Sequence, residues 1–178
     1  MDRTRLARAI ASVSTLSGQF TLRSGRTATT YFDKYRFEGD PKLLHAISEH
    51  LEPLVPPDTE VLAGLELGGV PLATALSLRT GLPAVFVRKQ AKEYGTRQLA
   101  EGGTVSGRRL LVVEDVVTSG GQVVASAEAL RALGAVVTHA LCVIDREDGG
   151  AAALRGVGIE LRPLFTRSDL EAAPPASS

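Results

Sequence analysis

The order of apolar and polar residues changes character near residue 40. Upstream, residues 4–17 carry apolar side chains close to helical spacing, which predicts an amphipathic helix with a polar cap at its start. Residues 20–23 and 30–33 predict two short strands on either side of a glycine-containing turn. The N-terminal part is therefore expected to contain one helix followed by a pair of strands.

From Asp40 and Pro41 onward, segments of helical periodicity alternate with short apolar runs. The expected helices cover residues 41–54, 70–80, 120–133 and 150–156, and the expected strands cover 60–64, 84–88, 109–114 and 135–144. An unbroken apolar run such as 110–113 suits a strand that is buried on both faces. The pattern predicts a mostly parallel sheet flanked by helices, with ligands bound at the carboxyl ends of the strands.

Composition excludes several classes of protein. The 178 residues include 20 Lys plus Arg and 20 Asp plus Glu, and a net charge of zero argues against nucleic-acid or anionic-membrane partners. Cys142 has no second cysteine to pair with, and His45, His50 and His139 are too scattered for a zinc site. We find no signal-peptide block and no apolar run long enough to span a membrane, so we expect a soluble, cytoplasmic protein.

The segment 110–122 carries the most specific chemistry. Its apolar strand ends in the adjacent carboxylates Glu114 and Asp115, and the small residues of 118–121 then lead into a helix. Backbone N–H groups at a helix N-terminus favour a phosphate, whereas carboxylates accept sugar hydroxyls or a hydrated Mg²⁺. The pairing predicts a sugar phosphate as the ligand. The alternative is an ordinary strand, turn and capped helix, with both acids solvated.

The thirteen residues 110–122 resemble the 5-phosphoribosyl 1-diphosphate (PRPP) signature of type I phosphoribosyltransferases. Three further stretches resemble motifs of the orotate phosphoribosyltransferase family, and they occur in the same order as in that family. They are 20–27 (F-x-L-K-S-G) followed by 31–33, 86–96 (R-K-x-x-K-x-H/Y-G) and 143–150 (D-R-x-x-G-G). The chain contains neither the P-loop nor the G-x-G-x-x-G pattern, which argues against ATPases and dinucleotide enzymes.

The resemblance implies the α/β fold of the type I phosphoribosyltransferases, with a small N-terminal hood. It implies one domain over 1–178, with 1–38 contributing to the hood, 39–165 forming the core and 171–178 a disordered tail. The implied reaction transfers phosphoribose from PRPP to orotate in pyrimidine (UMP) biosynthesis, giving orotidine 5'-monophosphate and pyrophosphate. It also implies Mg²⁺ as a cofactor bound with PRPP, and a homodimer that shares a basic loop across its interface.

The resemblance also assigns roles to individual residues. The catalytic set is Lys92, Arg88 and Lys89. The PRPP-binding set is Arg23, Arg88, Lys89, Lys92, Tyr94, Glu114, Asp115, Val116, Val117, Thr118, Ser119, Gly120, Gly121 and Gln122. The orotate-binding set is Tyr31, Phe32, Thr118 and Arg146. No protein side chain is expected to bind the metal directly, although Glu114 and Asp115 are candidates for contact through water.

Elementary physics supports two of these assignments. Residues 88–109 carry six basic and two acidic side chains, and such a long polar loop is suited to a cationic lid over a diphosphate. The alternative is a solvated loop. Arg146 follows a strand, and its guanidinium matches a planar carboxylate, which orotate has and uracil lacks. Here the alternative is a surface ion pair with Asp145, Glu147 or Asp148.

The chain departs from the common family pattern at three places. Arg23 stands in place of a lysine, and Tyr94 stands in place of a histidine. In the glycine-rich loop 64–71, Leu67 and Gly68 replace a tyrosine and a lysine, so we expect backbone groups to face the diphosphate there. Two other functions remain open: a phosphoribosyltransferase for another base, and a non-enzymatic regulator that senses PRPP.

Overall fold

The computed structural model describes residues 1–21, 25, 27–90 and 99–173. Its central sheet has six strands in the order β5–β4–β3–β6–β7–β8. The strands are β3 (Val61–Leu65), β4 (Ala84–Val87), β5 (Ala100–Glu101), β6 (Arg109–Val117), β7 (Val136–Asp145) and β8 (Glu160–Thr166). All neighbours are parallel except β4 and β5. The predicted, mostly parallel sheet is confirmed.

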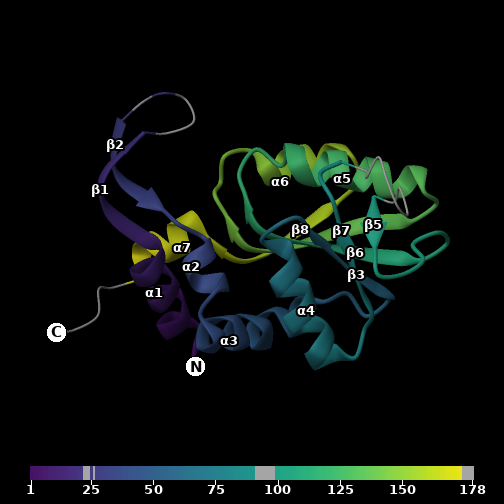
Figure 1. Cartoon of the computed structure of the whole chain (residues 1–178), viewed down its shortest axis with the longest axis horizontal. Helices are drawn as coiled ribbons and strands as arrows, with labels where there is room; N and C mark the ends of the chain where they lie inside the picture. The colour runs from purple at the N-terminus through teal and green to yellow at the C-terminus, as the bar shows by residue number, and fades with distance from the viewer. Residues whose placement is uncertain (22–24, 26, 91–98, 174–178) are drawn as a thin grey trace.

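Helices cover both faces of this sheet. Figure 1 shows α3 (Pro41–Leu51) and α4 (Gly69–Thr80) on one side, and α5 (Gly121–Ala132) and α6 (Gly150–Gly156) on the other. A short 3₁₀ helix, η1 (Glu52–Leu54), follows α3. Successive residues of a strand point to opposite faces, and β6 supplies Leu111 and Val113 to one buried cluster and Leu110 and Val112 to the other. The apolar run of β6 is therefore buried on both sides, as predicted.

The N-terminal elements form a separate two-stranded sheet with short helices beside it. They are α1 (Arg3–Ser14), β1 (Thr15–Thr21), β2 (Thr27–Phe32) and α2 (Tyr35–Glu38). The prediction of a helix as far as residue 17 was wrong, because Thr15 already pairs with Phe32 in the antiparallel ladder. The predicted strand over 20–23 corresponds to the end of β1, and residues 22 and 23 lie outside the described residues.

The sequence did not predict α2, β5, β8 or α7 (Arg167–Ala172). Pro163 interrupts the strand signal of β8, but a proline is tolerated there because β8 lies at the edge of the sheet. A capping box between Thr166 and Asp169 begins α7. An ion pair of 3.0 Å between Arg3 and Asp169 connects the N-terminal half of α7 to α1. Along the ranges that the structure describes, no helix is both long and apolar enough to cross a membrane.

A close approach between α6 and the loop after β6 gives the first prediction. A Cβ atom added to Gly150 would lie 2.5 Å from the carbonyl oxygen of Thr118, which overpacks this contact. We expect Gly150→Ala to lower the free energy of unfolding by about 1–3 kcal/mol in urea titrations. Gly156→Ala in the same helix is the control, because its Cβ would meet nothing within 4 Å. Equal stability of the two variants would contradict the packing described.

Candidate active site

A small cavity opens where β6 ends and α5 begins. It has a volume of about 220 Å³ and is lined by Glu114 and residues 116–123, which we call the cradle. Gly120 precedes the helix with a φ of 80°, a left-handed conformation that favours glycine. Thr118, Ser119, Gly121 and Gln122 are exposed there, beside the N-terminal turn of a 12-residue helix. The cradle thus presents hydroxyls and N–H groups where an anion is favoured.

Asp115 does not line the cradle, although the sequence grouped it with the residues that do. Adjacent strand residues point to opposite sides, and the side chain of Asp115 is fully buried below the loop that precedes α4. Its Oδ1 accepts a hydrogen bond of 2.5 Å from the backbone N–H of Val116. Its Oδ2 forms an ion pair of 2.5 Å with Lys34 Nζ. Glu114 is buried as well, with only 7% of its surface exposed. The alternative in which both acids are solvated was therefore wrong.

Glu38 completes an acid cluster, which we define as Glu38, Glu114 and Asp115. Burial, followed by the contact with Asp115, raises the pKa of Glu38 to about 8 and that of Glu114 to about 9. Burial opposes ionisation of Asp115 as well, but its contacts with Glu114, Lys34 and Glu38 hold its pKa below the ordinary value. Two carboxylate oxygens repel unless one carries a proton, so Glu38 and Glu114 are neutral at pH 7 and Asp115 carries the charge.

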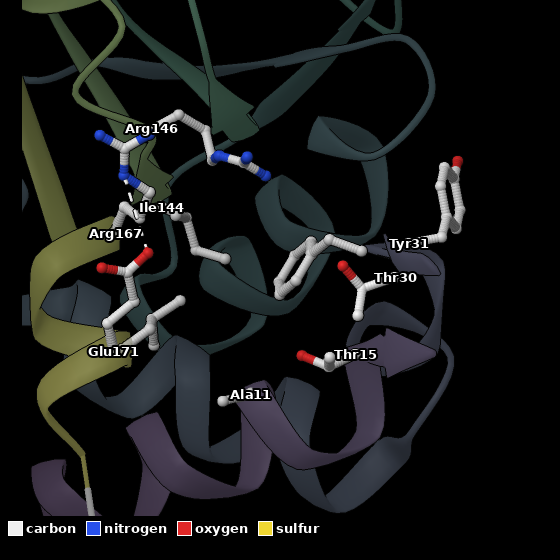
Figure 2. Close-up of a pocket in the computed structure, with 10 residues that line it drawn as sticks. Ala11, Thr15, Thr30, Tyr31, Ile144, Arg146, Arg167 and Glu171 are labelled. Carbon is white, nitrogen blue, oxygen red and sulfur yellow. Dashed lines mark ion pairs between the residues drawn. The ribbon is translucent and has the colours of Figure 1, made fainter. Parts of the chain in front are cut away.

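A second, larger cavity of about 310 Å³ lies beside the N-terminal hairpin, and we call it the arginine pocket. Its walls come from α1, β1, β2, the end of β7 and α7. The residues are Ala11, Thr15, Thr30, Tyr31, Phe32, Ile144, Arg146, Arg167, Leu170 and Glu171. Figure 2 shows the guanidinium groups of Arg146 and Arg167 on one side of the pocket and Thr30 and Tyr31 on the other.

The guanidinium of Arg146 faces this pocket without an ion pair, within the ranges that the structure describes, and its Nε is buried without a hydrogen-bond partner. The predicted alternative of a surface ion pair was wrong, because the nearby acids have other partners. Asp145 Oδ1 accepts from the Glu147 backbone N–H at 2.9 Å, Glu147 Oε2 accepts from Ser168, and Asp148 pairs with Arg167. A buried donor without a partner is costly, so this geometry favours an acceptor on a ligand.

The pocket and the cradle are neighbours. The backbone N–H of Arg146 donates a 2.8 Å hydrogen bond to the carbonyl of Val117, at the start of the cradle. Val117 and Asp145 are also partners in the parallel register of β6 and β7. The two cavities therefore start from the ends of adjacent strands, as the sequence predicted for Thr118 and Arg146. A ligand with one group in each cavity spans this edge of the sheet.

The structure describes only part of the predicted basic side of the site. Arg88 Nε lies 3.6 Å from Glu101, and the backbone N–H of Lys89 donates a 3.1 Å hydrogen bond to Glu66 Oε2. These contacts place both basic residues beside the loop that precedes α4, where Leu67 is 60% exposed. Arg23, Lys92 and Tyr94 lie outside the described residues, so their roles stay predictions.

Several residues of these sites were not found from the sequence, and five of them bear most on the chemistry. Three line the arginine pocket from α7, namely Arg167, Leu170 and Glu171, and two belong to the cluster around Asp115, namely Lys34 and Glu38. The capping pattern of Thr166 and Asp169 was a usable signal for α7. No local pattern marks Lys34 or Glu38, because their partners come from distant strands.

A parallel sheet with a phosphate cradle at the end of β6 and a base-sized pocket beside it defines a phosphoribosyltransferase of the type I fold. The phosphoribosyl transferase domain family matches residues 42–155. An orotate phosphoribosyltransferase of Nocardioides sp. is 53% identical over 173 residues, which is 97% of each chain. One of Halobacterium salinarum is 48% identical over 86% of this chain and 87% of its own. The chain belongs to the orotate phosphoribosyltransferase family.

Solved structures agree with this assignment. The orotate phosphoribosyltransferase of Mycobacterium tuberculosis in complex with Fe(III) dicitrate superimposes with a TM-score of 0.86 and 36% identity, covering 96% of this chain and 99% of its own. The same enzyme in complex with PRPP gives a TM-score of 0.82 and 33% identity over the same shares of the two chains. The predicted fold class is therefore confirmed.

The buried acid cluster predicts a dependence of stability on pH. The folded-state pKa of Glu38 lies above the value of the unfolded chain, so the folded protein binds more protons between those values and loses stability as the pH rises. In denaturant titrations, the free energy of unfolding should fall as the pH rises from about 4.5 to about 8. Glu38→Gln should make this slope shallower, with the remainder due to Glu114, and Glu128→Gln on the exposed side of α5 should leave it unchanged. Parallel slopes for wild type and Glu38→Gln would contradict the raised pKa.

Proposed function

We propose that this protein transfers the 5-phosphoribosyl group of PRPP to orotate, with the two substrates held in the cradle and the arginine pocket. The observation that carries the proposal is Arg146, whose guanidinium lines a cavity next to the cradle without an acidic partner among the described residues. A planar carboxylate such as that of orotate supplies the paired acceptors that a guanidinium matches.

In this proposal the cradle holds the 5'-phosphate of PRPP. The exposed hydroxyls of Thr118 and Ser119 and the N–H groups at the start of α5 donate to it, and the partial positive charge of the helix N-terminus adds to the attraction. Glu114 lines the same cavity, so its carboxyl group would meet ribose hydroxyls there. With its phosphate and ribose held in this way, PRPP would have its anomeric carbon facing the arginine pocket.

The family generally uses Mg²⁺ with PRPP, and we treat the ion as part of the bound substrate. The described residues hold no group of three or more His, Cys, Asp or Glu side chains arranged for a metal, so diphosphate and hydroxyl oxygens would supply most of its ligands. When bound, the ion stabilises the negative charge of the leaving diphosphate. Of the two predicted acids, Glu114 is the one that lines the cradle and can meet the ion's water shell.

Orotate would lie in the arginine pocket, with its carboxylate on Arg146 and its ring between Tyr31, Phe32 and Ile144. Tyr31 is 46% exposed, so its aromatic ring is free to contact a ligand rather than being part of the core. A ring nitrogen of orotate then attacks the anomeric carbon while pyrophosphate leaves. Uracil lacks the carboxylate and would leave the buried Nε of Arg146 without a partner.

The basic loop that begins at Arg88 and Lys89 would close over the diphosphate, with Lys92 as the main catalytic cation. Leu67, Val70 and Phe86 line a mostly apolar depression beside the start of this loop. An apolar surface next to a basic loop is consistent with a homodimer in which each loop serves the partner's site. Dimerisation and a cytoplasmic location stay predictions from the sequence.

The direct test of the proposed function is the release of pyrophosphate by the full chain. With PRPP and Mg²⁺, we expect turnover with orotate, and turnover at least about 100-fold lower with uracil, adenine or hypoxanthine, because only orotate has the carboxylate. Faster turnover with another base would assign the protein to that base. Binding of PRPP without turnover of any base would indicate a PRPP-sensing regulator instead.

A second prediction isolates the carboxylate contact. Arg146→Ala should raise the KM for orotate by about 10- to 100-fold, from the 1.5–3 kcal/mol typical of hydrogen bonds to charged groups, while the KM for PRPP changes little. Arg146→Lys should recover only part of the loss, because an ammonium cannot make the paired contact. Arg155→Ala, at an exposed position on α6, is the control. Equal losses for both substrates would show that Arg146 does not hold orotate.

A further inference from the structure

Lys34 connects three parts of the site through a single carboxylate. It lies between β2 and α2, its side chain is 34% exposed, and its Nζ pairs with the fully buried Asp115. Asp115 Oδ1 accepts from the backbone N–H of Val116, the residue that leads into the cradle. Asp115 Oδ2 lies directly below Gly68, where an added Cβ would come within 1.7 Å of that oxygen.

We propose that Lys34 is a positioning residue for PRPP, acting through Asp115 on the cradle and on the loop that precedes α4. This inference rests on the proposed function and adds a residue to it. Lys34 fixes the Asp115 carboxylate, which accepts a hydrogen bond from the Val116 backbone and lies so close to Gly68 that it limits how near the loop can approach. The cradle is proposed to hold the 5'-phosphate, and the loop that precedes α4 is expected from the sequence to face the diphosphate, so the spacing of these two segments would set how well PRPP fits.

Charge gives a second reason for the same assignment. Lys34 neutralises Asp115, and the raised pKa values of Glu38 and Glu114 keep those two acids mostly protonated, so the cluster and Lys34 together carry almost no net charge beside a polyanionic substrate. Without Lys34, the buried carboxylate of Asp115 keeps a negative charge without a cation, and this charge repels the phosphates. The cost of burying an unpaired charge also favours movement of the carboxylate toward water. Burial lowers the pKa of a lysine, yet the Asp115 contact raises that of Lys34, so the ammonium is present at neutral pH.

Binding of PRPP with Mg²⁺, measured by titration calorimetry on the full chain, tests the inference without requiring turnover. We expect Lys34→Met, which keeps the length of the side chain and removes its charge, to raise the Kd for PRPP at least about tenfold. Lys34→Arg keeps the charge and should stay within about threefold of wild type. Lys42→Met, at an exposed position of α3, is the matched control and should bind like wild type.

Steady-state kinetics separates positioning from a general loss of structure. Lys34→Met should raise the KM for PRPP more than the KM for orotate, and thermal unfolding should show a folded protein at the assay temperature. A lower melting temperature with an unchanged Kd for PRPP would overturn the inference and assign Lys34 a structural role only. Equal Kd values for Lys34→Met and Lys42→Met would overturn it as well.

Gly68→Ala tests the same route without altering Lys34, because the added methyl group must displace the Asp115 carboxylate. If Lys34→Met and Gly68→Ala both act through Asp115, the Kd of the double variant for PRPP should not exceed the larger Kd of the two single variants. A double variant whose Kd rises by the product of the two single increases would overturn the shared route. If the proposed function is wrong, the wild-type protein will not release pyrophosphate with orotate. If only this inference is wrong, wild type will turn over orotate and the Lys34 variants will bind PRPP as wild type does.

Discussion

The site depends on keeping one charged carboxylate out of water. Asp115 is fully buried at the end of β6, and an isolated buried carboxylate costs several kcal/mol. Lys34, the Val116 N–H and the neutral carboxyls of Glu38 and Glu114 together remove that cost. These groups come from the N-terminal elements and from the central strand, and Asp115 and Glu38 lie next to Gly68 in the loop that precedes α4. The position of Asp115 thus fixes how the N-terminal elements sit on the sheet edge that carries the two cavities.

A chain with zero net charge can still bind anions, because what matters at the site is the local charge. The acid cluster holds little more than one negative charge, and Lys34 offsets it, so the acids do not repel an anionic substrate. Among the described residues, Arg146 lines its pocket without an acidic partner, whereas Arg167 in the same pocket pairs with Asp148 and Glu171. One unpaired guanidinium in a cavity beside a phosphate cradle suits a pair of small anionic substrates. A strongly basic surface is not required for that purpose.

The sequence was sufficient for features whose signals are local. The strand, acids and small-residue loop of 110–122 lie within one short segment, so the cradle and its place at the sheet edge could be predicted. Lys34 and Glu38 could not, because they become part of the site only when folding brings them to Asp115 of the distant strand β6. The opposite directions of Glu114 and Asp115 follow from the period of a strand, and this signal was available but unused. The end of α1 was misplaced because pairing with β2 overrides helical spacing at Thr15.

A crystal structure of the full chain with orotate, PRPP and Mg²⁺, trapped before turnover, tests the central claim most directly. The account predicts the orotate carboxylate within hydrogen-bond distance of the Arg146 guanidinium, with the 5'-phosphate of PRPP on residues 118–122. It also predicts that Lys34 stays paired with the buried Asp115. Orotate bound away from Arg146, or a phosphate outside the cradle, would contradict the account.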